Sequence, residues 1–295
     1  MTMPPDGGGA AGAAGAAGRP APMRHRLRFA KAESVLLAEN KRHQFARYHA
    51  WSLYHHDAIY TFIPKNACTT LRFLVAVDNG FLDHGSDPAW LDNNNPTFSA
   101  APGFLVTARY SFVVLRCPFQ RLAAAFLDKM LAPNPTARRF LAVADPTIKI
   151  AAEADRRLDQ LTFADTVALM EESPADQLDH HFRPQVAFLV FEDYTRWFCL
   201  ERFGAAIDTL ADDLGFTVLD TRAETGHATS RLATVTGAFA AAPAGQLAAL
   251  KRGGQVPRPA DLFTPALIDR VARFYADDIR LYKERFGGEG PLFQV

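Results

Sequence analysis

The 295-residue sequence predicts an α/β protein with a largely parallel sheet flanked by helices. Short apolar runs rich in β-branched and aromatic residues alternate along the chain with longer segments of helical periodicity. Strands separated by helices form parallel sheets that are covered on both faces, and such buried strands consist of nearly continuous apolar residues. Hydrophobic residues make up 48% of the chain, which is enough for a sizeable core.

The first half of the chain contains two strand–helix pairs. A strand over 58–63 is stopped by Pro64 and followed by a helix over 69–77, and a strand over 111–116 is followed by a helix that begins at Pro118. The basic segment 24–54 has helical apolar spacing and predicts a helix that leads into the domain. Segment 78–103, rich in Asn, Asp, Gly and Pro, predicts a long loop, either facing a substrate or inert.

The second half predicts one strand and three helices. Thr162 and Asp165 form a capping box that starts a helix ending near Glu172, and the apolar run 188–191 is a strand candidate. A helix over 200–214 ends at Gly215, and Thr264 with Pro265 starts an amphipathic helix that continues through Tyr282.

Composition narrows the classes of function. Lys+Arg and Asp+Glu both number 32, so no global basic field indicates nucleic acid or anionic membrane as a partner. The three cysteines, Cys68, Cys117 and Cys199, form no CxxC pair, which favours reduced thiols in a cytoplasmic protein. Residues 1–23 are Ala/Gly-rich and predict a disordered tail, and 24–295 a single domain. No segment predicts a membrane span, although peripheral membrane association stays open.

The first predicted strand ends in a candidate anion site. A strand that leads into a helix presents unpaired backbone N–H groups and the positive end of the helix dipole. Lysine, amide and hydroxyl groups add donors there, in the candidate binding residues Lys65, Asn66, Ala67, Cys68, Thr69 and Thr70. The segment is not a Walker A loop, because GxxxxGK[ST] is absent. A surface lysine at an ordinary helix cap is the alternative.

The next predicted strand ends in Arg116, directly before a helix opened by Pro118. A guanidinium at this place can present two parallel N–H groups to a phosphate. Ligands of open α/β sheets bind beyond the carboxyl ends of the strands, so Lys65 and Arg116 are expected at one edge. Arg116 could instead serve only in a structural ion pair.

Three motifs together resemble the family 2 carbohydrate sulfotransferases. PKNACTTLR resembles the family signature IPKxACT. LRCPFQRLAAAFLDK resembles the signature RDPFxRLxSAFxxK, and its first arginine, Arg116, lies 51 positions after Lys65. LDHHFRPQ, ending at Gln185, is similar to DxHWxPQ. The resemblance implies a fold like that of P-loop nucleotide kinases and the donor 3′-phosphoadenosine 5′-phosphosulfate (PAPS), with its 5′-phosphosulfate at the first motif and its 3′-phosphate at the second. Two positions differ, because Cys117 replaces the family's aspartate and Ala124 its serine.

The resemblance also assigns roles to individual residues. Lys65 is expected to stabilise the leaving 5′-phosphate, and His181 to act as general base toward an acceptor hydroxyl, oriented by Asp179. Ser230 and Arg231 resemble a late family segment near the nucleotide, although a plain polar loop fits them equally. Adjacent histidines also occur as surface pairs or as hydrogen-bonded core groups. No metal is expected, since the histidine pairs have no cysteine partners.

The resulting hypothesis is a sulfotransferase that moves the sulfuryl group of PAPS to an acceptor hydroxyl, expected to belong to a sugar or glycoconjugate. A glycolipid, a small metabolite or a tyrosyl group stays open as acceptor. One alternative is a protein of the same fold that binds PAPS or its product but is catalytically impaired, which Ala124 keeps open. The other is a small-molecule kinase, disfavoured by the missing Walker A loop.

Overall fold

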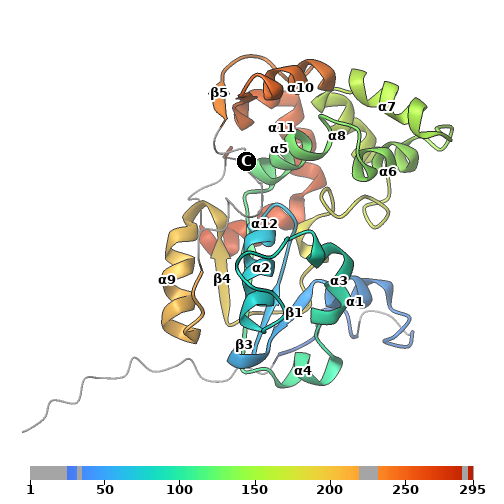
Figure 1. Cartoon of the computed structure of the whole chain (residues 1–295). Helices are drawn as coiled ribbons and strands as arrows, with labels where there is room; N and C mark the ends of the chain where they lie inside the picture. The colour runs from blue at the N-terminus through green and yellow to red at the C-terminus, as the bar shows by residue number, and fades with distance from the viewer. Residues whose placement is uncertain (1–24, 32–34, 219–231, 288–291, 295) are drawn as a thin grey trace, which may run out of the picture.

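The computed structural model describes residues 25–31, 35–218, 232–287 and 292–294. Its centre is a four-stranded sheet in the order β1 (Ala50–Leu53), β2 (Ala58–Thr61), β3 (Tyr110–Leu115) and β4 (Arg196–Cys199) (Figure 1). β2, β3 and β4 are parallel, whereas β1 runs antiparallel to β2. The carboxyl ends of three strands therefore meet at one edge, which is the edge expected to bind a ligand.

Apolar side chains cover both faces of this sheet. On one face, stacked rings of Tyr60 and Phe112 (4.9 Å between centroids) lie in a cluster with α2 (Cys68–Asp78), α3 (Trp90–Phe98) and α9 (Phe203–Leu214). On the other face, Ile59 and Val113 belong to a larger cluster with α5 (Pro118–Lys129) and α12 (Ala276–Phe286). The prediction of an α/β protein with a central sheet flanked by helices is confirmed.

The remaining helices surround this centre. α6 (Pro135–Ala144), α7 (Ala151–Gln160), α8 (Phe163–Glu172), α10 (Ala244–Arg252) and α11 (Pro265–Phe274) gather in the upper part of Figure 1. α1 (Lys41–Tyr48) and α4 (Pro102–Thr107) lie beside the sheet, and β5 (Ala233–Val235) pairs in parallel with β6 (Gln255–Pro257). Short 3₁₀ turns complete the described chain: Tyr54–His56, Gln185–Ala187, Leu200–Arg202 and Pro259–Leu262.

Several predicted helix ends are confirmed, because they depend on local chemistry. α5 begins at Pro118, and α8 has the capping box in which the Thr162 side chain accepts from the Asp165 N–H. α9 ends at Gly215, whose φ of 69° suits a residue without a side chain. Thr264 caps α11.

The leading helix over 24–54 was wrong in extent. Among the described residues of this segment, Lys41–Tyr48 is the one α-helix, and Trp51 lies in β1, where it pairs with Tyr60 of β2. The long loop over 78–103 was also wrong, because it contains α3 and the start of α4. Leu91 and Phe98 are two helical turns apart and buried, and Phe98 stacks on Trp51 at 4.5 Å. Tertiary packing thus outweighs the low helix propensity of the segment.

The strand over 188–191 was wrong as well. These four residues are buried, but only Phe191 pairs, in an isolated bridge to Leu27, and the strand that joins the sheet is β4. A short apolar run has no periodicity that separates a strand from other buried chain. The predicted last helix is divided at Tyr275 (φ −102°, ψ 29°) into α11 and α12. The predicted tail, 1–23, lies outside the described residues.

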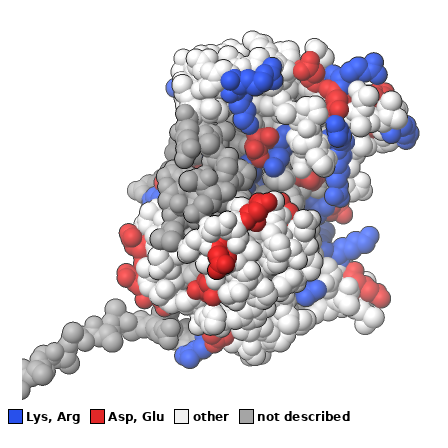
Figure 2. Space-filling model, in the orientation of Figure 1, with Lys and Arg blue, Asp and Glu red and all other residues white. Residues whose placement is uncertain are grey.

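Both signs of charge are mixed over the face of the molecule shown in Figure 2, with acidic side chains over α9. This agrees with the equal totals of acidic and basic residues. Within the described residues, no helix has the length and apolar character that a membrane crossing requires.

Candidate active site

The loop between β2 and α2 has the backbone of an anion-binding turn. Lys65 (φ 72°) and Ala67 (φ 57°) are both left-handed, and Ala67 is the N-cap of α2 without a side-chain cap hydrogen bond. The first amides of a helix have no partner within the helix and lie at the positive end of its dipole. The side chain of the N-cap residue makes no hydrogen bond to these amides, which suits the turn to an anionic ligand.

Asn66 holds this loop in place. Its side chain is fully buried, and Nδ2 donates to the Val114 carbonyl at 2.8 Å and to Gln185 Oε1 at 2.7 Å. Both amide hydrogens are therefore committed to the protein. Cys68, Thr69 and Thr70, the first turn of α2, are only partly buried.

Arg116 extends from the end of β3 toward the same loop. Its Nη1 donates to the Lys65 carbonyl at 3.0 Å, so the two cationic residues predicted from separate motifs lie together. Burial lowers the pKa of Arg116, and the nearby Glu201 carboxylate opposes this shift. Arg116 Nε is buried and has no hydrogen-bond partner among the described residues. A guanidinium N–H without a partner among the described residues, beside a helix N-terminus, fits a phosphate ligand.

The motif position of the family's aspartate is filled differently. The backbone N–H of Cys117 donates to Glu201 Oε1 at 2.9 Å, and Glu201 Oε2 accepts from the Tyr282 hydroxyl at 3.0 Å. Glu201 thus supplies a carboxylate beside Arg116 from the turn after β4. Glu201 falls within the predicted helix over 200–214, and sequence analysis gave it no role.

Gln185 connects the two loops. Its Oε1 accepts from Asn66 Nδ2 and from the Arg116 N–H (3.0 Å), and its Nε2 donates to the Arg116 carbonyl at 2.8 Å. The buried Asp278 of α12 in turn accepts the backbone N–H groups of Gln185 (2.7 Å) and Val186 (2.9 Å). Sequence reasoning assigned no role to Gln185, although it ends the third motif.

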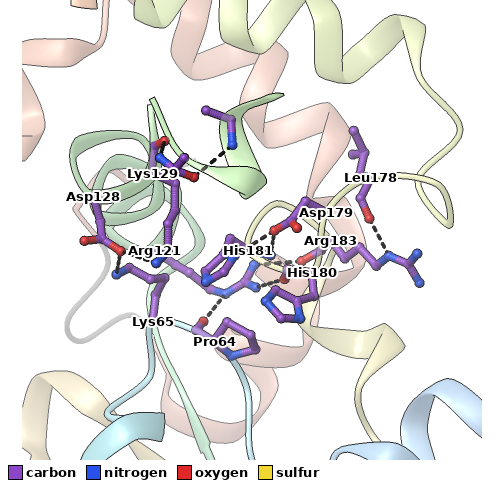
Figure 3. A network of polar contacts seen from close by, with 12 residues as sticks. Pro64, Lys65, Arg121, Asp128, Lys129, Leu178, Asp179, His180, His181 and Arg183 are labelled. Atoms are coloured by element: carbon purple, nitrogen blue, oxygen red, sulfur yellow. Dashed lines mark hydrogen bonds and ion pairs between the residues drawn. The ribbon is translucent and has the colours of Figure 1, made fainter. Parts of the chain in front are cut away.

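Arg121 is a second residue that sequence reasoning missed. Its side chain is fully buried and donates to three carbonyls, those of Pro64 (3.0 Å), Arg183 (2.7 Å) and His180 (3.1 Å) (Figure 3). It therefore joins the end of β2 to the segment that carries the histidine pair. The second arginine of LRCPFQR was the available signal.

His181 and Asp179 form a hydrogen-bonded pair beside these loops (Figure 3). Asp179 Oδ1 lies 2.6 Å from His181 Nδ1 and accepts the His181 backbone N–H at 3.0 Å. Burial opposes ionisation of Asp179, but the hydrogen bonds from His181 and the charges of His181 and His180 together outweigh it and lower the pKa of Asp179 to about 2. An ionised carboxylate places the imidazole proton on Nδ1, so Nε2 carries a free lone pair.

The surroundings also affect the histidine itself. Burial lowers the pKa of His181; Asp179 opposes the shift, and the ammonium groups of Lys129 and Lys65 add to it. A neutral imidazole with a lone pair on Nε2 can accept a proton near pH 7.

Asp179, His180 and His181 each offer a ligand atom within 4.8 Å of the others, the spacing of a possible metal site. This group contains the hydrogen-bonded pair just described, and the cations Lys65, Lys129 and Arg121 lie on one side of it (Figure 3). This positive field favours an anion over a divalent cation. That the protein works without a metal ion stays a prediction.

The structure brings together nearly all the residues predicted for the site. Lys65, Ala67, Arg116 and His181 meet at the carboxyl edge of the sheet, with Asn66 beneath them. Ser230 and Arg231, also predicted, lie outside the described residues.

The fold and this edge place a candidate anion site beside a histidine–carboxylate pair, an arrangement suited to group transfer. The chain belongs to the sulfotransferase family, whose model matches residues 48–284, and the resemblance to family 2 sulfotransferases is confirmed. The matched range contains both loops and the histidine pair, and the family membership supports transfer of a sulfuryl group. No curated protein and no solved structure matched the chain.

Proposed function

We propose that this protein transfers the sulfuryl group of PAPS to a hydroxyl of a carbohydrate acceptor. The observation that carries the proposal is the hydrogen bond between Arg116 Nη1 and the Lys65 carbonyl, which joins the two predicted anion-binding loops at the start of α2. A donor with a 5′-phosphosulfate and a separate 3′-phosphate needs two such anion sites. The sugar acceptor and a cytoplasmic location rest on the sequence resemblance and composition.

The nucleotide supplies an activated sulfuryl group, whose bond to the 5′-phosphate oxygen breaks as a bond to the acceptor oxygen forms. His181 Nε2 takes the proton of the acceptor hydroxyl, and Asp179 stabilises the resulting imidazolium. Lys65 and the first amides of α2 stabilise the electron pair left on the phosphate oxygen. The products are adenosine 3′,5′-bisphosphate (PAP) and a sulfate ester.

Arg116 is the proposed ligand of the 3′-phosphate, through its Nε, which has no partner in the described part of the chain. The family's serine at this phosphate is replaced by Ala124, which is half-buried on α5. A missing hydroxyl donor costs about 1 kcal/mol of binding. Arg116 therefore carries a larger share of phosphate recognition here.

The test is calorimetric titration of the protein with PAP, ATP and AMP. We expect PAP to bind more tightly than ATP or AMP, and Lys65→Ala and Arg116→Ala each to weaken PAP binding at least about tenfold, the loss expected for one charge-assisted contact. Asp155→Asn is the matched control, since it removes an ion pair with Arg138 at 2.8 Å away from the site. A folded wild type that does not bind PAP would exclude the proposal.

The catalytically impaired alternative is separated by a second variant. Ala124→Ser restores the family's hydroxyl, and we expect it to strengthen PAP binding about fivefold. Sulfuryl transfer by the wild type to any sugar in an acceptor screen contradicts the impaired reading. PAP binding without transfer by either protein supports it, and ATP-dependent phosphorylation would instead favour the kinase.

A further inference from the structure

The ammonium group of Lys65 is bound to a carboxylate of its own chain. Lys65 Nζ lies 2.8 Å from Asp128 Oδ2, and Lys129 Nζ lies 3.0 Å from the same oxygen (Figure 3). Lys65 belongs to the loop after β2, whereas Asp128 and Lys129 end α5. One carboxylate oxygen is thus shared between the lysine proposed for catalysis and a second lysine.

Asp128 is held at this place by the helix that carries it. Arg121 lies seven residues earlier on α5, on the same face of the helix, and its three hydrogen bonds fix that face against the end of β2. The side chains of Lys65 and Asp128 are 16% and 25% exposed, so their contact is shielded from water. The contact is therefore stronger than an exposed ion pair.

Lys65 needs a counter-ion, because most groups facing it are cationic or neutral. Burial lowers the pKa of Lys65 and Lys129 adds to this, whereas Asp128 opposes it most strongly and Cys68 to a smaller degree. His181 faces the same place from the third motif, and Arg116 touches the Lys65 carbonyl. Asp128 is the carboxylate that hydrogen-bonds to the Lys65 ammonium group.

We propose that Asp128 is a positioning residue that holds the protonated Lys65 in the free protein and yields it to the donor's phosphosulfate on binding. The exchange rests on the proposed function. The anionic donor replaces one negative partner of Lys65 by another, and Lys129 remains as the partner of Asp128. Lys65 thereby stays charged before the donor arrives, and the donor must compete with Asp128 for it.

The first experiment measures PAP affinity against pH in the wild type, Asp128→Asn and the control Asp155→Asn. Asparagine keeps the shape of Asp128 and removes its charge. We expect Asp128→Asn to bind PAP about fivefold more tightly at pH 6.5, because the competing carboxylate is gone. At pH 9 we expect the gain to be lost, since Lys65 without its counter-ion gives up its proton at lower pH. Asp155→Asn should follow the wild type throughout.

The second experiment does not depend on the nucleotide. Acetic anhydride reacts only with deprotonated amines, so the labelling rate of Lys65 at pH 8, read by mass spectrometry, reports its protonation. We expect labelling about tenfold faster in Asp128→Asn, the change for one unit of pKa, and unchanged in Asp155→Asn.

The outcomes distinguish this inference from the proposed function. Equal labelling rates in all three proteins, or equal PAP affinities with the same pH dependence, overturn the role of Asp128 while the wild type still binds PAP. A wild type that binds no PAP overturns the proposed function and the exchange with it. The labelling rates then still decide whether Asp128 keeps Lys65 protonated.

Discussion

Burial and a carboxylate act in opposite directions on His181. Burial lowers the pKa of the imidazole, whereas the hydrogen bond to Asp179 raises it, and the net pKa is lowered. A base of this kind is neutral at pH 7 and ready to accept a proton. The resting histidine is neutral despite the carboxylate of Asp179. The carboxylate instead fixes the tautomer of the ring and stabilises the imidazolium that forms.

Asp179→Asn is therefore expected to lower the pKa of His181 further, by about one unit, because the attractive charge is lost. Sulfuryl transfer should fall by about 10²–10⁴-fold, since the ring loses both its tautomer and its stabilising charge. Titration of the histidine ring by NMR between pH 4 and 8 measures the first effect. A His181 pKa above 6.5 in the wild type, or one that Asp179→Asn leaves unchanged, contradicts the assignment; Asp155→Asn should leave it unaltered.

At the scale of elements, the site depends on three segments tied together by buried side chains. The loop after β2 is joined to the end of β3 by Asn66 and Gln185, and to the histidine segment by Arg121. Asp278 of α12 anchors the backbone of Gln185 from behind. These residues touch no proposed ligand atom, but they decide where Lys65 and Arg116 lie.

Gln185→Ala tests this arrangement. It leaves the Arg116 N–H and one hydrogen of the Asn66 side-chain amide without an acceptor in a buried place, and we expect a loss of about 2–4 kcal/mol in the free energy of unfolding. PAP binding should weaken in the remaining folded protein, because the loops that carry Lys65 and Arg116 are no longer held in position relative to each other. Gln177→Ala, at an exposed glutamine of the same region, is the control for urea unfolding and calorimetry. Stability equal to that of the control would show that the loops are held by other contacts.

At the scale of the whole molecule, two buried groups make stability depend on pH in opposite directions. Burial lowers the pKa of His49 to about 3. In the unfolded chain His49 binds a proton near pH 6.5, whereas in the folded protein it stays neutral at that pH. The free energy of unfolding therefore decreases as the pH falls below 6.5. Burial raises the pKa of Asp278 to about 6. The contribution of Asp278 to the free energy of unfolding is present at low pH and is lost as the pH rises toward 6.

His49→Asn isolates the histidine, because the variant and the wild type share Asp278. We expect the variant to be less stable at pH 7, since His49 packs among aromatic rings and binds the Phe45 carbonyl at 2.7 Å. The difference should shrink by about 1.4 kcal/mol per pH unit below pH 6.5. Urea unfolding at pH 7, 6 and 5 measures it. The exposed His84→Asn should show no such trend, and a constant difference for His49→Asn would mean that His49 is protonated in the folded protein.

Elements defined by neighbouring residues could be predicted. The strands before Pro64 and Arg116, the helix starts at Pro118 and Thr264 and the end at Gly215 follow from caps, prolines and apolar runs. The same motifs placed Lys65, Arg116 and His181 in the candidate site. α3 and β1 could not be predicted, because the packing of Phe98 on Trp51 stabilises both and joins residues 47 positions apart.

The sequence by itself determined the family, the order of the strand–helix units and the cationic residue at the end of two strands, because these depend on contacts within a few residues. Only the tertiary structure decided which polar groups hold the site together. Gln185 meets Arg116 across 69 positions and Lys65 meets Asp128 across 63, and neither contact leaves a local pattern. Buried donors and charges are paired by whichever partner the packed core brings near, so these pairings emerge only when the sheet and its helices have assembled.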